Sequence, residues 1–262
     1  MKMNRITAGL LMVLLLATVF LAGCNQMKRE PKVIDLALVV NPTAGNPIHD
    51  LSPAEDWVAE ACRSYGSVSL VLEDGDPLVH QRVFQEPEPG EMSVETSLDC
   101  LAREQAKLLL FMAGRLTPVT EETDTLEAIS RAASAVRSGE GSVKRILIFS
   151  SGVSTRGYIS FLEGNIAGQS PEEIVTALTE HAALPDLEGV EIHWFNIGIT
   201  GGDQPQLSAP EKAMLQKIWE HILRSAGAEV FFHEYPVQQG RRNTCVPVTP
   251  VQVGEIKTVT AS

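Results

Sequence analysis

Residues 33–40, VIDLALVV, give the clearest indication of the architecture of this chain. It is almost continuously apolar and rich in Val, and a polar segment containing Pro and Gly follows it at residues 41–47. Such a run favours a strand that is buried on both faces, as in a parallel sheet. Similar β-rich runs recur further along the chain, at residues 68–72, 79–84, 143–149, 190–197 and 229–233.

Segments with helical periodicity lie between most of these runs. They cover about residues 52–65, 97–114, 122–137, 170–183 and 209–226. Ser52 and Ser170 are each followed by Pro and then by Glu, which predicts that both serines cap helices. Strands that alternate with helices form parallel pairs joined by crossover helices. The sequence therefore predicts an α/β three-layer sandwich with a mostly parallel, Rossmann-like sheet.

The first residues have the pattern of an export signal. Lys2 and Arg5 precede an uncharged stretch, residues 6–22, and Leu21-Ala22-Gly23-Cys24 closes it with small residues ahead of a cysteine. This pattern predicts a signal peptide over residues 1–23. The closing tetrapeptide resembles the bacterial lipobox, which implies cleavage before Cys24 and attachment of lipid, such as palmitate, to that cysteine. An ordinary signal peptide with a chance cysteine is the alternative.

The resemblance to a lipobox predicts a location for the mature protein. Cys24 would anchor the chain by lipid to the extracytoplasmic face of a membrane, and residues 24–32 would form a short tether. Residues 33–234 would then form the folded domain. The tail, residues 235–262, is rich in Val, Thr, Pro and Gln, and it is either disordered or an added edge strand near residues 244–253.

Charge and cysteine content limit the partners. The formal net charge is −12, and it becomes −14 without the two basic residues of the signal. A surface this acidic argues against nucleic acid, which selects clustered Lys and Arg. Cys62, Cys100 and Cys245 remain besides Cys24, and this odd number leaves at least one thiol unpaired. A disulfide between Cys62 and Cys100 stays open, and no Cys/His spacing suggests a metal site.

A candidate site follows from the predicted sheet. Ligands of open parallel sheets bind beyond the carboxyl ends of the strands. Here those ends are rich in hydroxyl, amide and glycine residues and nearly free of charge. The candidate binding residues are Asn41, Thr43, Asn46, Thr123, Asp124, Ser150, Ser151, Thr155 and Asp203.

The order of elements resembles a von Willebrand factor A domain over about residues 33–233. The resemblance rests on the Asn/Thr turn after the first strand, on TDTLEAI at 123–129 and on ILIFSSG at 146–152. LPDLEG at 184–189 and QPQL at 204–207 resemble A-like domains that precede an outer-membrane-protein-A-type, peptidoglycan-binding module in bacterial envelope proteins.

The family carries a metal-ion-dependent adhesion site, made of an Asp-x-Ser-x-Ser turn, a Thr and an Asp at a later strand end. This sequence departs from that motif. Asn41 stands at the first Asp, Thr43 and Gly45 replace the serines, and Ser150 or Ser151 replaces the later Asp. Divalent hard cations require carboxylate oxygens, and only Asp124 supplies one nearby. We therefore expect no metal and no cofactor.

These observations together predict a lipid-anchored cell-envelope protein that is not an enzyme. It would act as a protein-binding or scaffolding domain through its polar strand-end loops, and its partner would be an unidentified envelope protein. A serine-dependent envelope hydrolase is one alternative, since Ser151 precedes Gly152 at a strand-to-turn corner, but the flanking residues do not match G-x-S-x-G. A solute-binding lipoprotein is another, and it requires two lobes. Tyr158 and Phe161 lie in the segment after Gly152. They are either aromatic anchors for a binding partner or, as we favour, residues that pack against the end of the sheet.

Overall fold

The computed structural model describes residues 32–84, 95–162, 169–202, 204–235 and 237–238. The predicted signal peptide, Cys24, Asp203, Cys245 and the suggested strand at 244–253 lie outside these residues. The described elements belong to one compact unit that begins at Val33. Within the described part of the chain, no helix is both long and apolar enough to cross a membrane.

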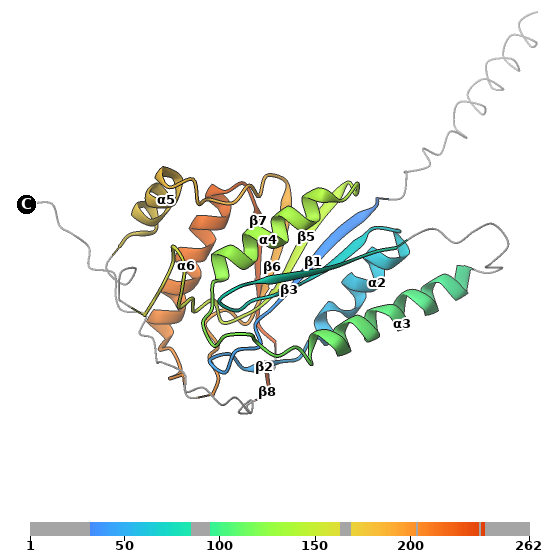
Figure 1. Cartoon of the computed structure of the whole chain (residues 1–262), viewed down its shortest axis with the longest axis horizontal. Helices are drawn as coiled ribbons and strands as arrows, with labels where there is room; N and C mark the ends of the chain where they lie inside the picture. The colour runs from blue at the N-terminus through green and yellow to red at the C-terminus, as the bar shows by residue number, and fades with distance from the viewer. Residues whose placement is uncertain (1–31, 85–94, 163–168, 203, 236, 239–262) are drawn as a thin grey trace, which may run out of the picture. The chain divides into compact units, whose positions relative to one another are not determined.

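Six strands form the central sheet (Figure 1). Their order is β4-β3-β1-β5-β6-β7, and all neighbours are parallel except β3 and β4. In order along the chain the strands are β1 (Ile34–Val40), β3 (Ser67–Leu72), β4 (Leu78–Val83), β5 (Val143–Phe149), β6 (Val190–Phe195) and β7 (Glu229–His233). Counted in this way, the order is 3-2-1-4-5-6, that of doubly wound α/β folds. The predicted fold class is confirmed.

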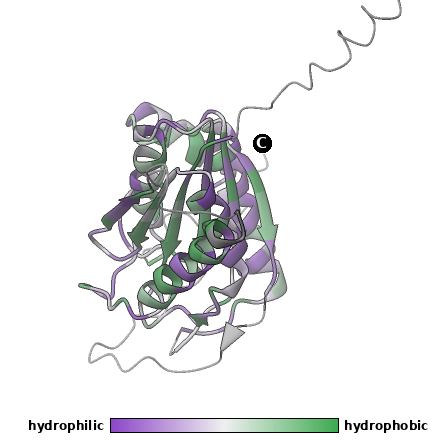
Figure 2. Cartoon of the chain, turned by 90° about the vertical axis from the view of Figure 1, so that its right-hand side faces the viewer, coloured by the Kyte–Doolittle hydropathy of each residue, from purple (hydrophilic) through white to green (hydrophobic). Residues whose placement is uncertain are grey.

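Helices cover both faces of the sheet, as Figure 1 shows. On one face lie α4 (Thr125–Ser138), α5 (Pro171–Glu180) and α6 (Ala209–Ser225). On the other face lies α2 (Glu55–Arg63), and α3 (Glu95–Ala113) packs beside it. Figure 2 shows that most of the strands are hydrophobic and that the helices are of mixed hydropathy.

The continuous apolar runs are explained by burial on both faces. Val39 and Ile148 belong to the core under α4, α5 and α6, whereas Leu38 and Phe149 belong to the core under α2 and α3. All seven residues of β1 are buried, including Asp35. The Asp35 carboxylate accepts hydrogen bonds from Ser67 Oγ, Gly141 N and Lys144 Nζ at 2.6–2.7 Å.

The structure corrects the predicted start of the first helical segment, residues 52–65. Ser52 does not cap it, because a 3-10 turn (Ser52–Ala54) comes first and α2 begins at Glu55 with no side-chain cap. Ser170 does cap α5, in a capping box with Glu173.

Two short strands escaped prediction. β2 (Ile48–His49) and β8 (Val237–Gln238) pair antiparallel in a separate two-stranded sheet. Two residues are too few to show the alternation that marks a strand. The disulfide left open between Cys62 and Cys100 is not present, since both thiols are free, one buried and one exposed.

Candidate functional site

The parallel strands bring the predicted polar residues to one edge of the sheet. Asn41 follows β1, Ser150 follows β5, and Asp124 opens α4 beside them. Of the candidates, Asn41, Thr43, Asn46, Thr123, Ser150 and Ser151 are all at most 3% exposed. Asp124 and Thr155 are half-buried, and Asp203 lies outside the described residues. The structure thus brings the described candidates together, but mostly as buried groups.

The turn after β1 is held by side-chain hydrogen bonds. Asn41 Oδ1 accepts from the backbone N of Thr43 at 3.0 Å and from its Oγ1 at 2.7 Å. Asn46 Nδ2 donates to Thr43 Oγ1 at 3.1 Å, and Asn46 Oδ1 accepts from Ser151 N at 2.7 Å. The amide and hydroxyl groups therefore join the end of β1 to the end of β5.

A second set of bonds fixes the loop that follows β5. The carbonyl of Thr123 accepts from Thr155 N at 2.8 Å, from Arg156 N at 3.0 Å and from Ser154 Oγ at 3.0 Å. Thr123 N in turn donates to Thr155 Oγ1 at 2.8 Å. The loop that carries residues 153–158 is thus bound tightly to the segment before α4.

Asp124 is the N-cap of α4, where its carboxylate accepts from Glu127 N at 3.1 Å. Burial raises the pKa of Asp124 above its usual value, and the nearby carboxylate of Glu127 adds to this effect. Asp124 therefore stabilises the start of α4.

Glu73 is the central residue that sequence reasoning missed. It follows β3 directly and is fully buried. Its Oε1 accepts from Asn41 Nδ2 at 3.1 Å, Thr125 Oγ1 at 2.8 Å and Ser150 Oγ at 2.9 Å. Its Oε2 has no hydrogen-bond partner among the described residues. Burial raises the pKa of Glu73 to about 7, although these three donors lower it and the charge of Asp124 raises it.

A sequence signal for Glu73 did exist. Residues 69, 71 and 73 share one face of the extended chain, and Val71 on that face belongs to the core under α4. A carboxyl group that continues a buried face is expected to be buried as well.

The turn Ser150-Ser151-Gly152 is not arranged as a nucleophile. Ser150 Oγ donates to Glu73 and accepts from Gly152 N, and Ser151 Oγ accepts from Val153 N. Two buried indoles, Trp194 and Trp219, donate to the carbonyls of Ser150 and Gly152 at 2.8 and 2.9 Å. These bonds explain why the turn is rigid.

The residues present do not fit a divalent cation. The oxygens of Asn41, Thr43 and Ser150 already take part in hydrogen bonds with one another and with Glu73. Glu73 is the carboxylate that the structure shows bonded to Asn41 and Ser150, whereas Ca²⁺ or Mg²⁺ needs several free oxygen ligands. Among the residues that the structure describes, no three His, Cys, Asp or Glu side chains are placed to hold a metal ion.

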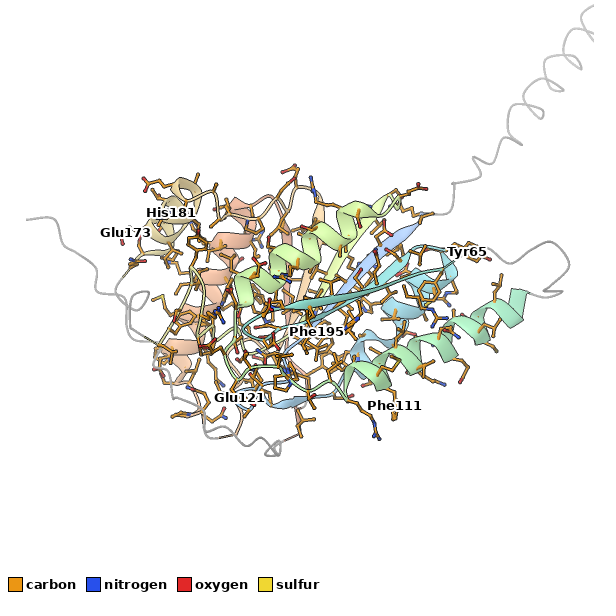
Figure 3. The ribbon with its side chains drawn as sticks, in the orientation of Figure 1. Tyr65, Phe111, Glu121, Glu173, His181 and Phe195 are labelled. Carbon is orange, nitrogen blue, oxygen red and sulfur yellow. The ribbon has the colours of Figure 1, made fainter. Side chains whose placement is uncertain are left out.

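Four exposed residues and the half-buried Glu121 surround this buried cluster. We call them the strand-end surface, and they are Val119, Glu121, Glu122, Arg156 and Tyr158. Glu121 Oε2 accepts from Ala44 N at 2.9 Å, and Figure 3 labels Glu121 at this end of the sheet.

A groove of about 580 Å³ runs beside the strand-end surface. Tyr158 and Arg156 line it on one side, together with charged side chains of both signs. Those are Asp76, Asp124, Glu127 and Arg131. Tyr158 is 61% exposed, whereas Phe161, three residues later, is 2% exposed and belongs to the core. Packing against the sheet end is therefore confirmed for Phe161 and is wrong for Tyr158.

Comparison with known proteins adds little to these observations. No protein-family model and no curated protein matches the chain. One similar solved structure is that of the manganese-loaded TRAP protein of Plasmodium vivax, at 12% identity and a TM-score of 0.33. The match covers 75% of this chain and 74% of that protein. At this level of similarity it supports no conclusion about a ligand or a function.

Proposed function

We propose that this chain is a lipid-anchored envelope protein that binds another protein through its strand-end surface. One observation carries this proposal. An exposed arginine and an exposed tyrosine lie two residues apart on a loop that buried hydrogen bonds hold in place. Arg156 and Tyr158 are exposed, whereas Ser154 and Ile159 on the same loop are buried.

Tyrosine and arginine are the residue types enriched at the centres of protein interfaces. Here the backbone N–H of Arg156 donates to the carbonyl of Thr123, and the Tyr158 ring lies 5.9 Å from that of His181. A surface ordered before binding loses less conformational entropy when a partner docks. These contacts therefore support a binding role for the loop.

The charges along the groove suggest the kind of partner. Arg156 pairs with Glu122 at 2.8 Å, and Arg131 pairs with Glu127 at 2.8 Å. All four side chains keep substantial exposure, so a partner can compete for each of them. A folded protein with mixed charge fits such a surface better than a uniformly charged polymer does.

The buried candidates act on this surface indirectly. Asn41, Thr43 and Ser151 reach no partner from their buried positions, so a contact role for them stays a prediction without structural support. Their hydrogen bonds fix the loops from which Arg156 and Tyr158 project. The resemblance to von Willebrand factor A domains, which work as adhesion modules, agrees with a binding role.

The test is affinity capture of the full-length protein from its own membranes. One arm uses the double variant Arg156→Ala/Tyr158→Ala. A matched control uses Lys107→Ala/Leu108→Ala, which changes an exposed cation and an exposed apolar residue on α3. The proposal expects one partner to be recovered by wild type and by the control but lost with the double variant. Equal recovery by all three would show that the strand-end surface is not the binding face.

A further inference from the structure

Glu73 draws together three separate segments of the chain. Its Oε1 accepts from Asn41 at the end of β1, from Ser150 at the end of β5 and from Thr125 in the first turn of α4. These donors lie 32, 77 and 52 residues from Glu73 in the sequence. No other described side chain in the site joins all three segments.

Each donor also holds a neighbouring turn in place. Asn41 positions Thr43, and Ser150 accepts from the backbone N of Gly152 at 3.1 Å. The segment that contains Thr125 also holds the loop of Arg156, because Thr125 N donates to Ser154 Oγ at 3.3 Å. Loss of the hydrogen bonds to Glu73 would therefore loosen each of the loops that carry the strand-end surface.

Among the residues that the structure describes, Glu73 Oε2 has no hydrogen-bond partner, and this argues for a specific role. A fully buried carboxyl group with one unpaired oxygen costs stability unless it brings another advantage. Replacement by an apolar residue would leave Asn41, Thr125 and Ser150 without their acceptor. The donors of the three loops explain why a side chain with an acceptor oxygen stands here.

We propose that Glu73 is the positioning residue of the strand-end surface and that it fixes the three loops in place of a divalent cation. This inference rests on the proposed function, because it states how the proposed binding surface is held in place. The role of Glu73 is tested without any binding partner, so a negative result for Glu73 can be told apart from a negative result for the proposed function. The strand-end loops of this chain need no metal, because a carboxyl group built into the fold supplies their common acceptor.

The test compares wild type, Glu73→Gln and Glu73→Ala by amide hydrogen exchange of the full-length protein. Gln keeps a carbonyl oxygen for the three donors, whereas Ala removes the acceptor. We expect Glu73→Ala to speed exchange of the amides of Thr43, Gly152 and Arg156 by about tenfold or more. Glu73→Gln is expected to restore slow exchange at these amides. Amides of Ile192 and Trp194 in β6 serve as the internal reference.

A second readout concerns metal directly. MgCl₂, MnCl₂ and EDTA are expected to leave the melting temperature of wild type unchanged, and Mn²⁺ is expected not to broaden the resonances of Asn41, Thr43 and Ser150. Saturable Mn²⁺ binding at these residues would overturn the proposal. Unchanged exchange of the loop amides in Glu73→Ala would overturn it as well.

If Glu73→Ala fails to fold, single-donor variants replace it. Thr125→Val and Ser150→Ala each remove one bond to Glu73 and are expected to speed exchange in the loops while β6 stays protected. Slow exchange in the loops of both variants would contradict the proposal.

Discussion

At the scale of single residues, two buried titratable groups act on stability in opposite directions. Burial raises the pKa of Glu73 to about 7. Burial, followed by the charge of His233, lowers the pKa of His193 to about 4. His193 Nδ1 lies 2.9 Å from His233 Nε2, and the His193 ring packs between Trp57 and Phe231. Their opposite pH dependences must be separated by mutation.

Glu73 is expected to make the protein less stable as pH rises. Between about pH 4.5 and pH 7 the native state keeps a proton that the unfolded chain has released, so the free energy of unfolding falls with rising pH. The full effect is about 3 kcal/mol. Urea denaturation of wild type and Glu73→Gln across this range checks it, since Gln cannot titrate. The difference between the two proteins should change with pH, and a constant difference would contradict the raised pKa.

His193 is expected to act with the opposite sign. Its lowered pKa means that the unfolded chain binds a proton between about pH 6.5 and pH 4 that the native state refuses, so stability is lost as pH falls through this range. In His193→Phe, which keeps an aromatic ring in the stack, this acid-side loss should shrink by about 2 kcal/mol. Denaturation at pH 4.5 and pH 7 measures it. An equal acid-side loss in both proteins would count against the prediction.

At the scale of elements, close approach of backbone segments sets the position of the strands. A Cβ added at Gly66 would lie 1.8 Å from the carbonyl oxygen of Ile34, just where β1 and β3 begin. Gly189, before β6, has a positive φ of 72° but nothing within 4 Å of an added Cβ. Substitution of Gly66 therefore tests a steric clash between strands, and substitution of Gly189 tests backbone strain alone.

Gly66→Ala is expected to destabilise far more than Gly189→Ala. The clash at Gly66 can be relieved only by moving β1 away from β3, which should cost more than about 3 kcal/mol. Gly189→Ala should cost about 1 kcal/mol, the usual strain of a non-glycine residue at positive φ. Thermal denaturation of both variants decides it, and equal losses would show that β1 and β3 are not packed as described.

The elements themselves could largely be predicted from the sequence. Apolar runs at 33–40 and 143–149 became β1 and β5 because both faces of each strand are buried, and the run at 229–233 became β7. β2 and β8 could not be predicted, because two-residue strands depend on pairing between distant segments. Ser52 had the local pattern of a cap, but the chain forms a 3-10 turn there instead.

The site was predictable in position but not in chemistry. The carboxyl edge of a parallel sheet collects the residues that follow its strands, which is why the predicted polar residues meet. The burial of Asn41 and Ser150 depends on Glu73, whose three partners come from distant parts of the chain. No local pattern in the sequence records such a set of bonds.

At the scale of the whole molecule, the proposed function combines an anchor with a binding surface. The anchor is proposed from the sequence of residues 1–24, and the binding surface is proposed from the described loops, so the two proposals are independent. Each needs its own experiment.

Cys24→Ser tests the anchor. Wild type is expected to incorporate labelled palmitate and to enter the detergent-rich phase on phase separation, because two acyl chains hold a protein firmly in a lipid phase. The variant should incorporate no label and stay in the aqueous phase. Circular dichroism of the secreted variant is the control for folding. Labelling of Cys24→Ser equal to that of wild type would contradict lipid attachment at this cysteine.

Site-specific photo-cross-linking in native membranes shows whether the strand-end surface contacts another protein. Benzoylphenylalanine replaces Tyr158 on the strand-end surface in one strain and Lys107 on α3 in another, so that both probes sit at exposed positions. We expect a discrete cross-linked product with a second protein from position 158 and none from position 107. Products of equal yield at both positions, or a product from position 107 alone, would contradict the strand-end surface as the binding face.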